Sequence, residues 1–252
     1  MPWSKTFDGA EPQRVNKWLA QAGVCSRREA EALIADALVA IDGEIVADPG
    51  RKILPGQTLT LADRAGADLA ARFAIVLNKP PGVVSAQPEP GQTPAARLVR
   101  RENLWGQAEA IPSAKASLPP LGRLDMESRG LLILSDDGVL AKALIGPEST
   151  IDKEYRVRVA GEINPRKLAL LRHGLELDGR KLKPADVKEI APNLLRFVLL
   201  EGRNRQIRRM CDAVDLRVTD LLRVRIGPLT LGDLPEGKWR PLTKAERAAF
   251  IS

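Results

Sequence analysis

The chain has 252 residues, 39 Lys and Arg against 32 Asp and Glu, and a formal net charge of +7. The length allows one large domain or a small domain joined to a medium one, and the positive charge favours a polyanionic partner, nucleic acid ahead of an anionic membrane surface. A single His excludes a His-rich metal site and leaves only one isolated imidazole for any His-based triad. No apolar run reaches the roughly 18 to 20 residues that span a bilayer, so no membrane association is predicted.

The two cysteines, Cys25 and Cys211, lie far apart in the sequence, and we find no secretory leader. A disulfide framework or a cysteine metal cluster is therefore not expected. The sequence predicts a reduced, cytoplasmic protein.

Two short helices are predicted near the N-terminus. Apolar residues at helical spacing between 15 and 22 are followed by Gly23, a common helix end. Ser26 and Glu29 fit a capping box that begins the second helix. Arg27 and Arg28 fall in its first turn, where cations oppose the helix dipole; they are either phosphate contacts or a solvated surface pair.

A small sheet and a linker follow these helices. Asp42-Gly43 between two short apolar runs predicts a hairpin, and residues 58–61 predict a further strand. The segment 63–72 has small and charged residues with little periodicity, which is typical of a linker. We therefore divide the chain into a domain at 12–62, a linker at 63–72 and a larger domain at 73–252.

The charge is unevenly distributed between these domains. Residues 1–62 carry 7 basic and 8 acidic side chains, a net charge of −1, which leaves +8 for residues 63–252. A small domain that binds nucleic acid must therefore use a local cluster. Its candidates are Arg14, Lys17, Arg27, Arg28, Arg51 and Lys52.

The larger domain mixes strands and helices without strict alternation. Strands are predicted at 74–77, 131–134, 155–159, 195–200 and 221–226, and helices at 139–145, 165–171 and 204–214, with a hairpin segment at 174–179. Many of the prolines fall between 86 and 120, which predicts loops and a short helix over 94–101. The fold class is α+β with a mixed, mostly antiparallel sheet.

Asp125 stands between Arg123 and Arg129, just before a buried strand. It is either an ion-pair partner that fixes a loop or an ionised carboxylate in a partly desolvated pocket, ready to act as nucleophile or base.

An arginine cluster lies near the C-terminal end of the chain. Residues 201–225 contain seven Arg and no Lys, beginning with Arg203, Arg205, Arg208 and Arg209. Arginine binds phosphate in a bidentate manner and stacks on bases, so the cluster favours nucleic acid over a solvated helix face.

Tyr155 is the only tyrosine. Its ring is either part of the core or a platform for an extruded base. Phosphate-binding glycine loops and the nucleophile-elbow motif are absent from the sequence.

Five ordered blocks resemble the bacterial ribosomal-RNA pseudouridine synthases of the RsuA/RluB/RluE/RluF family. Residues 14–60 resemble their S4-like RNA-binding domain, and the other blocks begin at Asn78, Gly122, Lys153 and Glu201. The resemblance implies the pseudouridine synthase fold. It also implies an isomerase that cuts the glycosidic bond of a target uridine, turns the uracil and rejoins it to the ribose through a ring carbon, without metal or organic cofactor.

The resemblance also implies roles for individual residues. Asp125 is the catalytic carboxylate, acting either as a nucleophile at the anomeric carbon or in a proton-abstraction route through a glycal. Tyr155 stacks on the flipped base and is a candidate general base, and Arg208 pairs with Asp125. Arg123 helps to fill the gap left by the extruded nucleotide. The remaining RNA-binding candidates are Arg14, Lys17, Arg27, Arg28, Arg203, Arg205 and Arg209.

We therefore expect an enzyme that isomerises uridines in ribosomal RNA, with the large-subunit RNA favoured and a transfer RNA open as a second substrate. The alternative is an RNA-binding ribosome-assembly protein whose catalysis is lost or secondary. A monomer is expected. The segment 100–120 is longer than the family pattern suggests, and we expect it to form a surface loop that affects the choice of RNA site.

Overall fold

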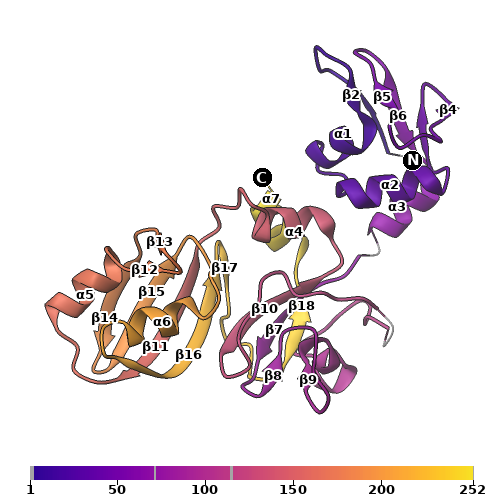
Figure 1. The fold of residues 1–252 in the computed structure, drawn as a ribbon. Helices are drawn as coiled ribbons and strands as arrows, with labels where there is room; N and C mark the ends of the chain where they lie inside the picture. The colour runs from indigo at the N-terminus through magenta and orange to yellow at the C-terminus, as the bar shows by residue number, and fades with distance from the viewer. Residues whose placement is uncertain (1–2, 71, 114–115, 252) are drawn as a thin grey trace. The chain divides into compact units, whose positions relative to one another are not determined.

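The computed structural model describes residues 3–70, 72–113 and 116–251. The chain forms two compact units. The first contains the chain up to Ala74 together with Ser135–Ala143, and the second contains Ile75–Leu134 and Leu144–Phe250. Figure 1 labels most of the elements named below.

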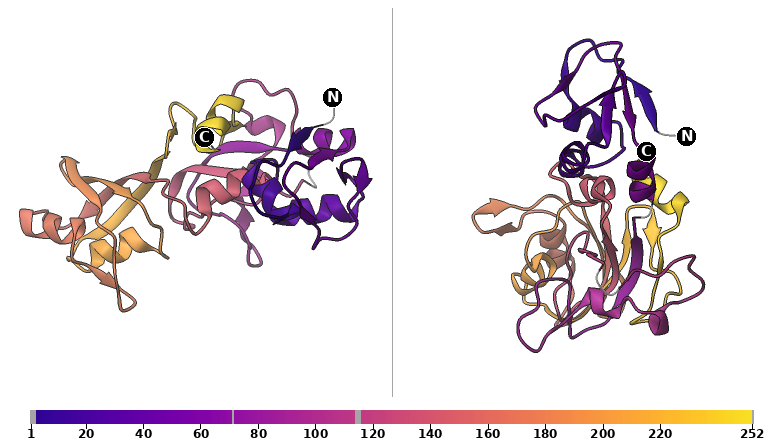
Figure 2. Two further views of the ribbon diagram at one scale, coloured as in Figure 1. Left: turned by 90° about the horizontal axis from the view of Figure 1, so that it is seen from above. Right: turned by 90° about the vertical axis from the view of Figure 1, so that its right-hand side faces the viewer.

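The N-terminal unit contains the predicted pair of helices and a small antiparallel sheet. The helices are α1 (Val15–Gln21) and α2 (Arg27–Ala35), and the sheet has the order β1-β6-β3-β4. Its strands are β1 (Ser4–Thr6), β3 (Val39–Ile41), β4 (Glu44–Ile45) and β6 (Thr58–Leu61), while β2 (Gln13–Arg14) pairs with β5 (Lys52–Ile53). The indigo part of the chain in Figure 2 contains these short elements.

Local sequence signals account for most of this unit. The Ser26 side chain accepts a hydrogen bond from the Glu29 backbone N–H, and the Glu29 carboxylate accepts one from the Ser26 N–H, so the predicted capping box is confirmed. Asp42 and Gly43 both have positive φ, as the predicted hairpin turn requires. Trp18 packs against the rings of Trp3 and Phe7 in the core of the unit.

The predicted irregular linker at 63–72 contains a helix, α3 (Asp63–Ala70). Ala65 is fully buried in the N-terminal core and Leu69 packs against it. Tertiary burial of one apolar side therefore outweighs the weak periodicity of this alanine-rich segment. Residue 71 of the expected linker lies outside the described residues.

The second unit is built on an eight-stranded sheet with the order β14-β15-β11-β16-β10-β7-β18, to which β17 adds by pairing with β16. The pairs of β11 with β15 and β16, of β14 with β15 and of β18 with β7 are antiparallel, whereas β10 and β16 are parallel. The predicted mixed, mostly antiparallel sheet is confirmed.

The strands of this sheet are β7 (Ala74–Lys79), β10 (Arg129–Ser135), β11 (Lys153–Ala160), β14 (Asp186–Ala191), β15 (Leu194–Leu199), β16 (Arg217–Ile226), β17 (Leu229–Thr230) and β18 (Trp239–Pro241). The helices of the unit are α5 (Pro165–Arg172), α6 (Gln206–Asp212) and α7 (Lys244–Ile251), with short turns η1 (Ala95–Leu98) and η2 (Arg101–Asn103). Helix α4 (Gly138–Ile145) belongs to the first unit up to Ala143. Two small pairs complete the unit: β8 (Val83–Val84) with β9 (Thr93–Pro94), and β12 (Glu176–Leu177) with β13 (Arg180–Lys181).

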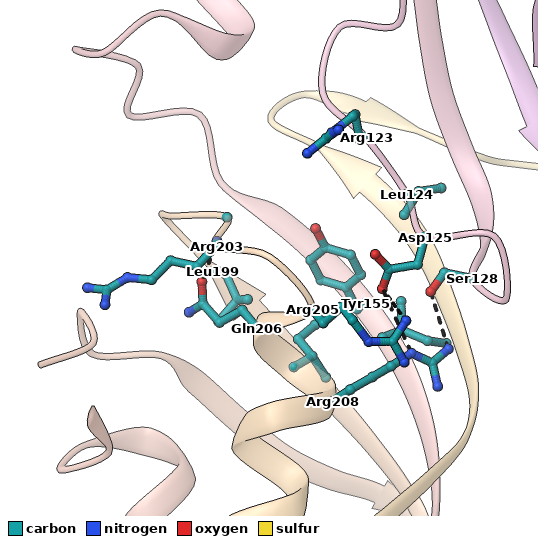
Figure 3. A pocket seen from close by; sticks show the side chains of 13 residues that line it. Arg123, Leu124, Asp125, Ser128, Tyr155, Leu199, Arg203, Arg205, Gln206 and Arg208 are labelled. Carbon is teal, nitrogen blue, oxygen red and sulfur yellow. Dashed lines mark hydrogen bonds and ion pairs between the residues drawn. The ribbon is translucent and has the colours of Figure 1, made fainter. Parts of the chain in front are cut away.

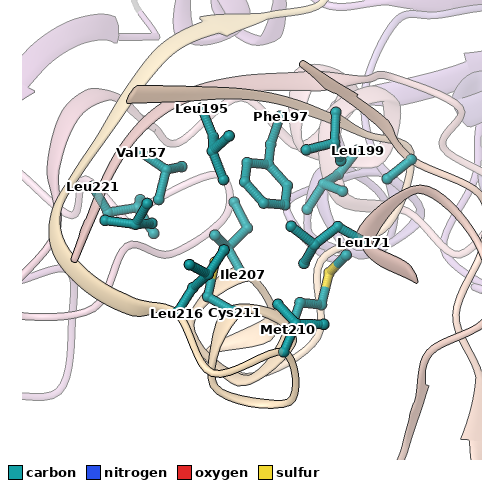
Figure 4. Close-up of a cluster of buried hydrophobic side chains, with 14 of the residues drawn as sticks. Val157, Leu171, Leu195, Phe197, Leu199, Ile207, Met210, Cys211, Leu216 and Leu221 are labelled. Carbon is teal, nitrogen blue, oxygen red and sulfur yellow. The ribbon is translucent and has the colours of Figure 1, made fainter. Parts of the chain in front are cut away.

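Helices α5 and α6 bury their apolar sides against one face of β14, β15, β11 and β16. Figure 4 shows this cluster, in which Leu171 from α5 and Ile207 and Met210 from α6 meet Val157 and Phe197 from the sheet. Val157 and Phe197 are fully buried in this cluster, and the partly buried Tyr155 ring packs against it.

The segment 100–120, apart from residues 114 and 115, which lie outside the described residues, begins with η2 and then runs without a helix or a strand of two or more residues. It is attached at both ends. Near its start the Trp105 N–H donates to the Trp239 carbonyl and the Trp239 indole N–H donates to the Arg100 carbonyl, and at its end Pro120 forms an antiparallel bridge with Leu134. Across the described ranges, no helix combines the length and apolar character needed to cross a bilayer.

Candidate active site

Asp125 lies on a loop that connects to β10 and is held at several backbone atoms. The Ser85 hydroxyl donates to the Leu124 carbonyl at 2.7 Å and accepts from the Leu124 N–H at 2.9 Å. The Gly82 N–H donates to the Met126 carbonyl at 2.9 Å. The loop on either side of Asp125 is therefore fixed to Gly82 and Ser85, in the segment that follows β7.

Lys79, at the end of β7, is fully buried beneath this loop. Its ammonium donates to the carbonyls of Pro80, Val83 and Met126 at 2.8, 2.7 and 3.3 Å. Burial lowers the pKa of Lys79 to about 8, although the negative charge of Asp125 acts in the opposite direction. A buried cation thus ties the turn to the loop beside the candidate carboxylate.

Arg205 and Arg208 approach Asp125 from the start of α6. The Asp125 Oδ2 lies 3.8 Å from Arg205 Nη1 and 3.9 Å from Arg208 Nε. Arg208 also donates from Nη2 to the Ser128 hydroxyl at 3.3 Å, and its buried Nε has no hydrogen-bond partner within the described part of the chain. The expected Asp125–Arg208 pair is present as an ion pair without a direct hydrogen bond.

Glu127 is a second carboxylate at the same place. It accepts a hydrogen bond from Arg205 Nη1 at 2.9 Å and lies 3.7 Å from Arg208 Nε. This hydrogen bond raises the pKa of Arg205. Two carboxylates and two guanidinium groups therefore form one cluster.

Tyr155 completes the pocket from β11. Its ring lies beside the Asp125 carboxylate in Figure 3, and its inner edge packs against the apolar cluster below. Arg123 is exposed at the rim of the pocket, on the side away from Arg205 and Arg208. The pocket is lined by Arg123, Leu124, Asp125, Ser128, Tyr155, Leu199, Gly202, Arg203, Arg205, Gln206, Ile207, Arg208 and Leu221.

The parallel pair β10–β16 aligns the Asp125 loop with the strand that carries Arg223. Gly130 has a φ of +107°, and a Cβ atom there would lie 2.4 Å from the Arg223 carbonyl oxygen. Only glycine permits this close approach. Arg223, nearly fully buried, then donates from Nε to the Leu131 carbonyl at 2.7 Å and from Nη1 to the Arg123 carbonyl at 3.4 Å.

Arg203 and Arg209 direct their side chains to other parts of the protein. Arg203 donates to the carbonyls of Leu177, Arg180 and Lys181 in the β12–β13 hairpin, and Figure 3 shows its guanidinium pointing away from Asp125. Arg209 forms a bidentate pair with Asp178 at the tip of the same hairpin, and the hydrogen bonds lower the pKa of Asp178. Their contacts to RNA stay predictions.

Four of the six basic candidates in the N-terminal unit share the same surroundings. Arg14, Lys17, Arg27 and Arg28 are all exposed, and none has an ion pair with another described residue. Arg27 and Arg28 occupy the first turn of α2, as predicted. Their charges are available to a ligand.

This arrangement holds a carboxylate next to an aromatic ring in a pocket lined by arginine side chains. Residues 3–70, 72–113 and 116–251 contain no cluster of three or more His, Cys, Asp or Glu side chains suited to a metal ion. A carboxylate in this position can transfer a proton or act as a nucleophile.

Sequence reasoning missed the residues that support the site. Lys79, Ser85, Glu127 and Ser128 were not predicted as site residues, although Lys79 stands at the end of an apolar strand, where a charged side chain is unusual. Glu127, two residues after Asp125, gives no sequence signal that distinguishes it from a solvated charge.

Comparison with known proteins supplies independent information. A family model described as RNA pseudouridylate synthase matches residues 73–213, and an S4 domain model matches residues 13–59. The dual-specificity RNA pseudouridine synthase RluF of Escherichia coli (strain K12) is 34% identical over 238 residues, which cover 92% of this chain and 76% of that protein.

A second relative and a solved structure agree with this result. The ribosomal large subunit pseudouridine synthase B of Pseudomonas aeruginosa is 34% identical over 248 residues, covering 93% of this chain and 60% of that one. A crystal structure of a pseudouridylate synthase matches with a TM-score of 0.65 and 25% identity, over 96% of this chain and all of that one.

Proposed function

Because the chain belongs to the RNA pseudouridine synthase family and is therefore an isomerase, we propose that it converts specific uridines of large-subunit ribosomal RNA to pseudouridine, with Asp125 as the catalytic residue. The observation that carries this proposal is the convergence of Asp125, Tyr155 and Arg208 on one pocket. The choice of RNA is supported by the large-subunit enzyme of Pseudomonas aeruginosa, at 34% identity.

The chemistry starts with extrusion of the target nucleotide, because the sugar of a stacked and paired base is inaccessible to a side chain. Arg123, exposed at the rim, helps to fill the gap in the RNA stack. The uracil stacks on Tyr155, whose half-buried ring is supported by Phe197 and the surrounding apolar cluster.

Asp125 then acts at the ribose, either by attack on the anomeric carbon or by proton abstraction that leads to a glycal. In both routes the bond from the sugar to the ring nitrogen breaks, and a bond from the sugar to a ring carbon forms. The ring carbon loses its proton and the released nitrogen gains one, so the overall reaction is an isomerisation. Tyr155 is the candidate base for the ring proton.

Arg208 is a positioning residue in this scheme. It is mostly buried, held by Ser128, and lies 3.9 Å from Asp125. Its positive charge attracts the Asp125 carboxylate, so the fixed guanidinium restricts the orientation of that carboxylate.

The N-terminal domain provides further contacts to RNA through Arg14, Lys17, Arg27 and Arg28, and the pocket rim does so through Arg205. A second RNA substrate, such as a transfer RNA, a monomeric state and a cytoplasmic location stay predictions. The alternative is a ribosome-assembly protein without catalysis. RNA binding alone does not require a tyrosine and a fixed Asp125 in one pocket, so this arrangement favours the enzyme.

The proposal is tested by mapping pseudouridines in ribosomal RNA from cells whose chromosomal copy carries Asp125→Asn, compared with the wild type. We expect the loss of one or a few large-subunit sites and no change elsewhere. An unchanged map, with the variant protein present at normal abundance, would contradict the catalytic role.

A further inference from the structure

Glu127 forms a hydrogen bond with Arg205, the arginine at the pocket rim that we assign to RNA binding. Arg205 Nη1 is 2.9 Å from Glu127 Oε2 but 3.8 Å from Asp125 Oδ2, so its hydrogen bond goes to Glu127. Glu127 also lies 3.7 Å from Arg208 Nε. The Glu127 carboxylate therefore stands between two guanidinium groups at the edge of the pocket.

This pair is accessible to a competing anion. The side chains of Arg205 and Glu127 are 42% and 53% exposed, whereas that of Arg208 is only 14% exposed. Exposed ion pairs contribute little net stability because water solvates the separated charges well. An anionic ligand can thus replace Glu127 as the hydrogen-bond partner of Arg205 without disturbing the buried side chains.

A phosphodiester has the chemistry to do so. Like a carboxylate, it presents two oxygens that share one negative charge, and the planar guanidinium group binds both in the same geometry. Arg205 lines the pocket that contains Asp125 and Tyr155, where a nucleotide must enter.

We propose that Glu127 occupies, in the RNA-free enzyme, the position of a phosphate of the bound RNA, and that this phosphate displaces it from Arg205. This inference rests on the proposed function, since it assigns a phosphate contact for the same site. Glu127 then sets the affinity for RNA: every binding event must break its pair with Arg205, which weakens binding.

The test measures affinity for a transcript of complete large-subunit ribosomal RNA at several salt concentrations, with excess poly(A) as competitor. Glu127→Gln keeps the side-chain shape and removes the charge. We expect it to lower Kd about two- to fivefold, the range implied by typical exposed pairs, while the salt dependence stays near that of the wild type, because Arg205 contacts the same phosphate in both complexes.

Arg205→Gln provides the second arm of a double-mutant cycle. If Glu127 acts by holding Arg205, Glu127→Gln gives no gain in affinity and no change of slope in the Arg205→Gln background. Glu189→Gln, at an exposed carboxylate on β14 of the same unit, is the matched control for loss of one negative charge. It should leave Kd and slope near those of the wild type.

A Glu127→Gln protein that binds as the wild type does or more weakly overturns the inference. The same holds for a gain that persists in the Arg205→Gln background or equals that of Glu189→Gln. Pseudouridine formation by the wild type in the same RNA is measured in parallel. Failure of the wild type to isomerise would contradict the proposed function, whereas normal turnover with no effect of Glu127→Gln contradicts only the role of Glu127.

Discussion

At the scale of single residues, Asp125 is positioned by side chains that lie outside the pocket. Ser85 binds both backbone atoms of Leu124, and Lys79 binds the carbonyl of Met126, so the residues before and after Asp125 are both fixed. The carboxylate can therefore be pre-organised while 29% of its side chain stays exposed to solvent.

Ser85→Ala tests this support. The change leaves the buried Leu124 N–H and carbonyl without their partner, and we expect the free energy of unfolding to fall by about 1 to 3 kcal/mol. Urea denaturation measures the loss. Ser149→Ala, which removes longer bonds of 3.2 and 3.4 Å at a partly exposed site, should cost less; equal costs for the two variants would argue against a special role for Ser85.

Lys79 predicts a dependence of stability on pH. Burial lowers its pKa to about 8, against an ordinary value of 10.5 in the unfolded chain. Between these pH values the unfolded state binds more protons, so the contribution of this group to the free energy of unfolding rises with pH, by as much as about 3 kcal/mol over the full range.

The comparison of wild type with Lys79→Met isolates this contribution, because all other titrations are shared. The difference in unfolding free energy, wild type minus variant, should become more positive from pH 8 to pH 10. A difference that does not change with pH would show that Lys79 keeps its ordinary pKa in the folded protein.

At the scale of elements, the parallel pair of β10 and β16 joins the Asp125 loop to the strand of Arg223. Gly130→Ala places a Cβ atom 2.4 Å from the Arg223 carbonyl oxygen, a backbone atom that cannot move alone. We expect a loss of more than about 3 kcal/mol in thermal or urea unfolding, in the range of severe backbone conflicts.

Gly202→Ala is the matched control for that substitution. A Cβ atom at Gly202 meets nothing within 4 Å, and its φ lies outside the positive range. This variant should keep the stability of the wild type. A tolerated Gly130→Ala would mean that the two strands do not approach as closely as described.

The elements that local sequence signals define were predictable, and those that depend on distant partners were not. The capping box of Ser26 and the Asp42-Gly43 turn are confirmed because each depends on residues within one turn. Strands β14 and β18 were missed: five of six residues in β14 are exposed at the sheet edge, and β18 has three residues whose place depends on pairing with β7.

The candidate site shows the same division. The pocket residues Asp125, Tyr155 and Arg208 were named from blocks of sequence, and the structure brings them together. The hydrogen bonds from Arg203 to the β12–β13 hairpin could not be predicted. Their acceptor carbonyls lie 22 to 26 residues from Arg203 in the sequence, and the arginine-rich composition around Arg203 indicated RNA binding instead. The pairing of Arg205 with Glu127 spans 78 residues and has no local signal.

At the scale of the whole molecule, the net charge of +7 is unevenly distributed between the two domains. The first 62 residues carry a net charge of −1, so the S4 domain can contribute only through its exposed basic side chains. Affinity for RNA should fall steeply with salt, since several phosphate contacts from both domains release counterions.

Replacing Arg27 and Arg28 by Ala tests the contribution of the S4 domain. We expect weaker RNA binding and a salt slope reduced by about 1.4 to 1.8, the sum for two phosphate contacts, while the rate at saturating RNA stays that of the wild type. Thermal unfolding controls for structure. A lowered melting temperature with unchanged binding would instead assign both arginines to the stability of α2.

The central claim is that Asp125 performs the isomerisation in this pocket, and purified protein with large-subunit ribosomal RNA tests it most directly. We predict that the wild type forms pseudouridine in a single turnover, that Asp125→Asn binds the RNA with similar affinity but forms none, and that Tyr155→Leu also binds without isomerising. Pseudouridine formation by Asp125→Asn at the wild-type rate would contradict the account.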